Sequence, residues 1–212
     1  MMKSIRLTAL AALVAVGASR TAGAQIVTNG GFEFGNPSDP SQLVGWTLSG
    51  NIDGLTFRDC SFFVIGSHTG SCAGFSGTIG GLAYLSQNVA THVGSHYSLS
   101  FWLANDNYYL PSECSLDAPF LCPDNEFTAS LGGSELAHFN DLGNQGYQHF
   151  NLDYLASATT TSLSFGMRNS PSYMALDDVS MTEVAPEPAT LLFVATGMFA
   201  IFGVNRRRPP RA

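Results

Sequence analysis

Apolar and polar residues alternate in short runs through the middle of the chain, between residues 25 and 188. The clearest run is His-Tyr-Ser-Leu-Ser-Phe-Trp-Leu-Ala-Asn at 96–105, in which one face carries Tyr97, Leu99, Phe101 and Leu103. Clusters of Gly, Ser, Asn, Asp and Pro separate the runs, and no helical period is sustained between them. This pattern predicts antiparallel strands that each bury one face.

Further runs predict strands at 60–65, 82–89, 126–131, 147–154, 161–168 and 173–182. Eight or so short strands predict an all-β fold, a two-sheet antiparallel β-sandwich at residues 25–183, because one open sheet would leave too much apolar surface in water. In the last run the apolar positions change parity at Asp177-Asp178. A β-bulge at these aspartates would return both halves of the strand to the core.

Both ends of the chain carry export features. Residues 1–24 combine Lys3 and Arg6, a short apolar segment and an Ala-Gly-Ala site, which predicts a signal peptide cleaved before Gln25; an uncleaved anchor is the alternative. At the other end, residues 189–204 carry no charge and are closed by Arg206, Arg207 and Arg208. This pattern predicts a transmembrane helix with a cytoplasmic basic end, and the alternative is a buried core helix.

The C-terminal segment 184–212 resembles the PEP-CTERM sorting signal of exported bacterial proteins. The resemblance rests on Pro186-Glu187-Pro188, the apolar helix after it and the arginine cluster. It implies recognition by an exosortase-like membrane protease and delivery to the cell surface or to an extracellular polysaccharide matrix. The passage through the inner membrane would be transient if the helix is removed.

The charge of the middle segment limits its partners. All sixteen Asp and Glu residues lie between residues 25 and 188, together with only two basic residues, Arg58 and Arg168, so this segment has a formal net charge of −14. Such a domain repels phosphate backbones, which argues against nucleic acid, and it attracts divalent cations.

Four cysteines in an exported chain predict two disulfides. Three connectivities are possible, and we favour Cys60–Cys72 with Cys114–Cys122 because each pair would close a short local loop. The absence of a Cys-x-x-Cys pair and the scattering of the five histidines argue against zinc.

The opening and closing segments of the predicted sandwich resemble those of galactose-binding-like jelly-roll domains, which include many carbohydrate-binding modules. The resemblance rests on Asn-Gly-Gly-Phe-Glu at 29–33, Gly-Trp at 45–46 and Leu-Asp-Asp-Val-Ser at 176–180. It implies a structural calcium held by Glu33 and Asp178, with Asp177 as a further ligand. Carboxylates and backbone carbonyls suit calcium, although ordinary turn hydrogen bonds are the alternative role for these residues.

Trp102 is the candidate sugar-stacking residue, because it lies on the Ser and Ala face of its strand. Tyr108 and Tyr109 in the following loop would add contacts at its rim. The alternative is that a loop covers Trp102, as expected for a residue type that is highly buried on average, and Trp46 is predicted to be core.

The sequence contains no nucleophile elbow and no paired metal-binding histidines, and Gly-rich residues 74–81 precede a strand, so we interpret them as a loop. We therefore expect no enzyme. The main hypothesis is an exported envelope or matrix protein with a structural or glycan-contacting sandwich. A carbohydrate-binding adhesin module is the alternative, and a secreted hydrolase is a more remote one.

Overall fold

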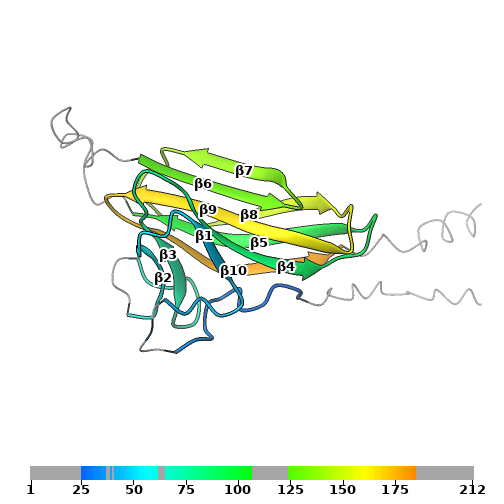
Figure 1. Cartoon of the computed structure of the whole chain (residues 1–212), viewed down its shortest axis with the longest axis horizontal. Helices are drawn as coiled ribbons and strands as arrows, with labels where there is room; N and C mark the ends of the chain where they lie inside the picture. Colours follow the sequence, from blue (N-terminus) through cyan, green and yellow to red (C-terminus); the bar gives the residue numbers. More distant parts are fainter. Residues whose placement is uncertain (1–24, 37–38, 40, 62–64, 107–123, 185–212) are drawn as a thin grey trace, which may run out of the picture. The chain divides into compact units, whose positions relative to one another are not determined.

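The described part of the chain consists of two five-stranded antiparallel sheets. The computed structural model describes residues 25–36, 39, 41–61, 65–106 and 124–184, and within them it has ten strands and no helix (Figure 1). The strands are β1 (Thr47–Gly50), β2 (Thr56–Asp59), β3 (Ala73–Ser76), β4 (Ala83–Ala90), β5 (His96–Asn105), β6 (Asp124–Leu131), β7 (Ser134–Asn140), β8 (Gln145–Leu155), β9 (Thr160–Ser170) and β10 (Met174–Glu183). One sheet has the order β1-β4-β9-β6-β7, and the other has the order β2-β3-β10-β5-β8. The predicted all-β, two-sheet fold is confirmed for this part of the chain.

The core lies between the two sheets and is built from alternate residues of their strands. Leu99, Phe101 and Leu103 of β5 are fully buried. The ring of Phe101 lies 5.4 Å from that of Phe127 and 5.2 Å from that of Phe165, both of which come from the opposite sheet. Burying each such side chain contributes about 1.5–3 kcal/mol. The predicted strand at 96–105 and its buried face are therefore confirmed.

Five more predicted strands are confirmed to within a few residues, and they correspond to β4, β6, β8, β9 and β10. The bulge predicted in the last of them is also present, because the register of β10 against β5 shifts between Asp177 and Ser180. Asp178 adopts a φ of 48°, a left-handed conformation that aspartate tolerates better than most residues. Val179 and Met181 are buried beyond the bulge, as the change of parity required.

Two predictions about secondary structure are wrong. The strand expected at 60–65 is absent from the described residues of that segment, since β2 ends at Asp59 and Cys60 begins a disulfide-closed loop. The loop expected at 74–81 begins inside β3, whose four residues are all buried. Gly74 is required in this strand because the Phe32 ring would lie 2.8 Å from a Cβ at that position. A strand that is buried on both faces shows no alternation, which explains the error.

The N-terminal segment runs beside the bulge and brings the opening and closing motifs together. Val179 donates its N–H to the carbonyl of Gly30 at 3.0 Å, and Ile26 donates to Met181 at 3.2 Å. Trp46 is 8% exposed, donates its indole N–H to the Asn29 carbonyl and stacks on Phe32, so its predicted core position is confirmed. This junction places Glu33 and Asp178 in the lining of one surface pocket.

The predicted signal peptide at 1–24 lies outside the described residues. So do the sorting motif, with Pro186, Glu187, Pro188 and Arg206 to Arg208, and the predicted helix at 189–204. Within the described ranges, the structure has no helix of the length and apolarity needed to span a bilayer. The export features therefore stay predictions.

Candidate functional site

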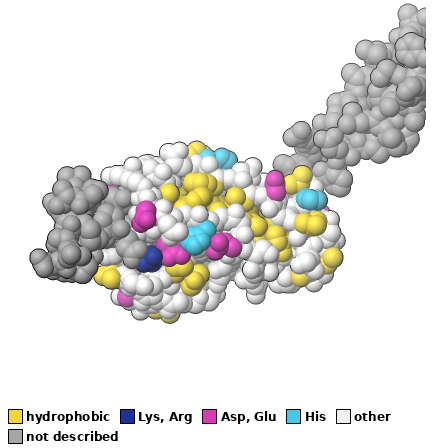
Figure 2. All heavy atoms as spheres, turned by 90° about the horizontal axis from the view of Figure 1, so that it is seen from above, with side chains coloured by type: hydrophobic (Ala, Val, Ile, Leu, Met, Phe, Trp, Pro, Cys, Tyr) yellow, Lys and Arg dark blue, Asp and Glu magenta, His cyan; other side chains and the backbone are white. Residues whose placement is uncertain are grey.

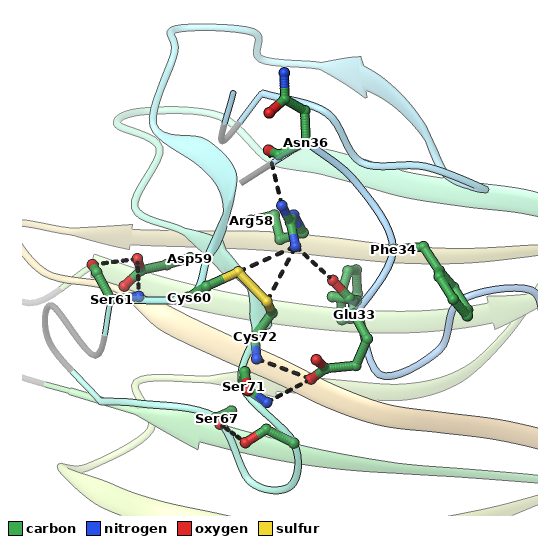
Figure 3. The surroundings of a disulfide bond; sticks show 12 residues. Glu33, Phe34, Asn36, Arg58, Asp59, Cys60, Ser61, Ser67, Ser71 and Cys72 are labelled. Carbon is green, nitrogen blue, oxygen red and sulfur yellow. Dashed lines mark hydrogen bonds between the residues drawn. A yellow bond between two sulfur atoms is a disulfide. The ribbon is translucent and has the colours of Figure 1, made fainter. Parts of the chain in front are cut away.

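A disulfide-closed loop lies against the sheet β2-β3-β10-β5-β8 and frames the candidate site. Cys60 and Cys72 are bonded with an S–S distance of 2.06 Å, which confirms the first predicted pair. Figure 3 shows the Arg58 side chain directed at this bond, and its Nη1 lies 3.1 Å from each sulfur. Arg58 is 3% exposed, and its Nη2 donates to the Asn36 carbonyl at 3.0 Å. The loop is thus held by a covalent bond and by a buried cation beneath it.

Glu33 fixes the end of the same loop. Its Oε1 accepts hydrogen bonds from the backbone N–H groups of Ser71 at 2.8 Å and Cys72 at 2.9 Å, as Figure 3 shows. Gly70 has a φ of 63° and lies so close to this carboxylate that a Cβ there would overlap with it. Glu33 therefore joins the N-terminal segment to the disulfide loop.

Asp177 is fully buried at the bulge and accepts three backbone hydrogen bonds. Its Oδ2 accepts from the N–H groups of His68 at 2.8 Å and Thr69 at 3.3 Å, and its Oδ1 accepts from Asp178 at 2.7 Å. Burial raises the pKa of Asp177 to about 6, and the neighbouring Asp178 carboxylate adds to this rise, while the three N–H donors oppose it. The middle of the loop is therefore tied to a carboxylate that titrates near neutral pH.

Asp178 holds the side chains of the same loop residues. Its Oδ2 lies 2.6 Å from Nδ1 of His68, and its Oδ1 accepts a hydrogen bond from the Thr69 hydroxyl at 2.7 Å. Both residues of the pair are partly exposed, with 25% of the His68 side chain and 28% of the Asp178 side chain accessible. The pair orients the imidazole over the neighbouring strand β5.

Trp102 lies under that imidazole. The two rings are stacked with their centroids 3.8 Å apart and 17° between their planes. His149 of β8, the register partner of Trp102, lies 4.9 Å away on the outer face of the sheet and is exposed. Trp102 is therefore half-buried, and one part of its ring is already occupied by a side chain from the disulfide loop.

Tyr147 completes the aromatic group. Its ring meets that of His68 edge-on at 5.3 Å, and its hydroxyl donates to the Gly66 carbonyl at 2.8 Å. Burial, with the nearby carboxylates of Asp177 and Asp178, raises the pKa of Tyr147 well above its usual range, so the phenol stays neutral and keeps donating. The result is a half-exposed cluster of rings with imidazole nitrogens and carboxylate oxygens at its edge.

The structure brings together some of the predicted site residues. Glu33 and Asp178 both lie next to Gly31, where a Cβ would come within 3.9 Å of the former and 3.6 Å of the latter. Their carboxylates make the hydrogen bonds that the alternative interpretation expected, and no group of three or more His, Cys, Asp or Glu side chains suited to a metal occurs among the described residues. Calcium at this place stays a prediction. Tyr108, Tyr109 and the predicted Cys114–Cys122 bond lie outside the described residues.

Three site residues were not found from the sequence, namely His68, Tyr147 and His149. His68 comes from an irregular loop 34 positions before Trp102, so no periodicity connects the two residues. Only the pair Cys60 and Cys72 marked this loop as special. Tyr147 and His149 share the outward parity of β8, and a correct pairing of β8 with β5 would have placed them beside Trp102.

Comparisons with known proteins support the fold but name no family. No protein-family model matches the sequence, and a search of curated proteins found no match. Among solved structures, the carbohydrate-binding module TmCBM61, determined in complex with β-1,4-galactotriose, aligns with a TM-score of 0.55 and 16% identity over 76% of this chain and 99% of that one. At this identity the similarity concerns the fold, so the chain shares the β-sandwich fold of this module.

Two further structures align less closely. The CBM22-1 xylan-binding domain of Xyn10C from Paenibacillus barcinonensis has a TM-score of 0.46 and 13% identity over 78% of this chain and 98% of that one. The K2 cleaved adhesin domain of Lys-gingipain has a TM-score of 0.49 and 14% identity, over 75% and 97% of the two chains.

Proposed function

We propose that residues 25–183 form an exported carbohydrate-binding module that attaches the protein to a polysaccharide, as an adhesin or matrix component. The observation that carries this proposal is the half-exposed ring cluster of Trp102, His68, Tyr147 and His149 on the outer face of a sandwich sheet. Aromatic rings combined with a few oriented polar groups are the usual means by which proteins hold a sugar. The galactotriose bound by TmCBM61, which has the same fold, supports a glycan as the ligand class.

The negative charge of the domain favours neutral glycans over anionic ones as ligands. With a net charge of −14 between residues 25 and 188, the domain repels uronic-acid and sulfated polymers. Hydroxyl groups of a neutral sugar, in contrast, can donate to the Asp178 carboxylate and can form a hydrogen bond with the exposed imidazole of His149. Retention is therefore expected on galactan, xylan or glucan rather than on alginate-type polymers.

Affinity electrophoresis and a glycan array with the exported, disulfide-bonded protein test this proposal. Trp102→Ala should lower the affinity about tenfold, because one stacking contact contributes about 0.5–1.5 kcal/mol. Trp102→Phe, which keeps a ring under His68, should retain much of the binding. Ser98→Ala, on the same face of β5 but away from the rings, is the control. Equal retention of the wild type and Trp102→Ala would contradict the proposed site.

We also propose that the module binds glycan without cleaving it, and that it reaches its destination through the C-terminal signal. Incubation with a panel of chromogenic glycosides should release no product; steady turnover would favour the secreted hydrolase. Replacing Pro186, Glu187 and Pro188 by alanine should retain the protein in the membrane fraction. An unchanged distribution would count against sorting by an exosortase-like protease.

A structural calcium at Glu33 and Asp178 belongs to the same proposal. Both carboxylates flank Gly31 at the junction of the opening and closing segments, and oxygen donors of this type suit calcium. Bound calcium would reinforce that junction and raise the melting temperature. Calorimetry without calcium uptake, together with a melting temperature that chelation does not change, would remove the metal from the proposal.

A further inference from the structure

The outer face of the other sheet, β1-β4-β9-β6-β7, presents a second aromatic residue. Tyr84 of β4 is 36% exposed, and within the described part of the chain no residue forms a hydrogen bond with its hydroxyl group. The residue belongs to a different sheet from Trp102. An exposed ring with a free phenol on a flat sheet is a feature that the first site does not use.

Two glycines make room for this ring against the sheet. Gly166 of β9 is the register partner of Tyr84, and a Cβ there would lie 2.8 Å from Cε1 of the ring. On the other side, a Cβ at Gly50 of β1 would lie 2.7 Å from Cδ2. Any larger residue at either position would displace the ring from its position against the sheet. Gly50 also has a φ of 78°, which itself favours glycine, whereas Gly166 lies inside β9, where glycine weakens a strand and is explained here by the close packing of the Tyr84 ring.

A network of charged and polar side chains lies next to the ring on the same face. Arg168 donates through Nε to Oε2 of Glu126 at 3.0 Å, and Nε2 of His138 lies 3.0 Å from Oε1 of the same carboxylate. The register places Arg168 two residues along β9 from Gly166, so the spacing of strands and residues puts it about 8 Å from Tyr84. Two linked sugar residues can span that distance.

Small polar residues form the surface on the opposite side of the ring. Ser86, Ser164 and Ser130 are register neighbours across β4, β9 and β6, and each lies two positions along its strand from Tyr84, Gly166 or Thr128, on the same face. Serine side chains are short, so they protrude little above the sheet. An extended chain can therefore lie across this face. On the side of the molecule that Figure 2 shows, acidic side chains are more frequent than basic ones.

We propose that this face is a second binding surface for a neutral polysaccharide chain, with one sugar ring on Tyr84 and the hydroxyl groups of the next sugar on the Arg168–Glu126–His138 network. A planar guanidinium and a carboxylate match the spacing of vicinal hydroxyl groups, and the acidity of the domain excludes anionic chains here as well. The inference rests on the proposed glycan-binding function and extends it. Contacts on two opposite sheets make one molecule bivalent, so it cross-links polysaccharide chains.

Titration calorimetry and turbidity with a soluble neutral galactan, xylan or glucan, whichever the array identifies, test this inference on the exported protein. Tyr84→Ala should lower the affinity of one class of sites about tenfold, and it should abolish the turbidity that cross-linking produces while the Trp102 site still binds. Trp102→Ala should weaken the first site and abolish the turbidity while the Tyr84 surface still binds. The variant with both changes should bind at neither surface. Glu126→Gln should weaken the Tyr84 surface, whereas Asn88→Ala, on the same face of β4 but away from the ring, should behave as the wild type.

The outcomes separate the two proposals. Wild-type stoichiometry and turbidity in Tyr84→Ala would overturn the second surface and leave the Trp102 site standing. A lower melting temperature with unchanged binding would also overturn it and assign Tyr84 the role of covering Gly166. If the wild type binds no glycan at all, the proposed function itself fails.

Discussion

The two basic residues of the β-sandwich at residues 25–183 lie in different environments, one on each sheet. Arg58 of β2 is 3% exposed and bonds to backbone carbonyls and disulfide sulfurs beneath a covering loop. Arg168 of β9 is partly exposed, with 20% of its side chain accessible, and pairs with Glu126. Arg58 thus holds a disulfide-closed loop on its sheet from beneath, whereas Arg168 takes part in an ion pair near the surface of the other sheet. The comparison teaches that the two cations have different structural roles, one as a buried anchor and one as a partly exposed member of an ion pair.

The largest expected effect comes from the buried arginine. Arg58→Met should lower the free energy of unfolding by about 3–4 kcal/mol, because the carbonyls of Phe32 and Asn36 lose their donor where the chain is packed. Arg168→Met, the matched change on the other sheet, should cost about 1 kcal/mol. Urea unfolding of both variants measures the difference. Equal losses would contradict the distinction between a buried and a partly exposed cation.

Removal of the disulfide should have the next largest effect. The bond closes a sequence separation of 12 residues, so Cys60→Ala with Cys72→Ala should cost about 3 kcal/mol through the entropy of the unfolded chain. The loop carries His68, so its loosening should also uncover Trp102 and increase the quenching of tryptophan fluorescence by acrylamide. Trp46 is 8% exposed in the core and should contribute little to this change. Unchanged quenching would mean that the loop stays in place without the bond.

Asp177 should make the covered sheet sensitive to pH. Its pKa is raised to about 6 in the folded chain by burial, against an ordinary value of 3.8, so folding favours the protonated carboxyl. The resulting stabilisation is complete below about pH 4 and is lost as the pH rises through 6. Relative to Asp177→Asn, measured in a chelator, the wild type should lose about 2–3 kcal/mol between pH 4 and pH 7. A constant difference between the two proteins would show that Asp177 does not titrate in this window.

The smallest expected loss of stability concerns the packing of the Tyr84 ring against Gly166. Gly166→Ala should cost about 1–2 kcal/mol, because the new Cβ would lie 2.5 Å from the Thr128 hydroxyl and 2.8 Å from the Tyr84 ring. Gly146→Ala, in β8 with no atom within 4 Å of the new Cβ, is the matched control and should be neutral. Thermal unfolding compares the two variants. Weaker glycan binding by Gly166→Ala would show that the position of the Tyr84 ring matters for the proposed second surface. A neutral Gly166→Ala would mean that the ring moves aside freely.

The strand pattern could be predicted for most of the long strands that bury one face, but β2 and β7 were not predicted. Residues 96–105 gave both the strand and its inward residues, and the break at Asp177-Asp178 gave the bulge. The same reasoning failed for β3, which is buried on both faces, and for β1, a short run whose residues are mostly exposed. Alternation carries information only when the two faces of a strand meet different surroundings.

The site was harder to predict because it depends on contacts across the sheet. Trp102 was identified from its parity along β5, but nothing local indicated that His68 would stack on it. The link between the two residues is a chain of tertiary contacts, from the disulfide through the N–H groups of the loop to the carboxylates of the bulge. Each of these contacts joins segments that are far apart in the sequence.

By itself, the sequence determined that this chain contains antiparallel strands with one buried face, a bulge in the last of them and a strongly acidic middle segment, because alternation and charge are local properties. The tertiary structure decided which aromatic rings are covered and which are open, because strand register and loop anchoring set the neighbours of each ring. As a result, the ring of Trp102 stacks on His68, and the ring of Tyr84 lies beside Gly50 and Gly166.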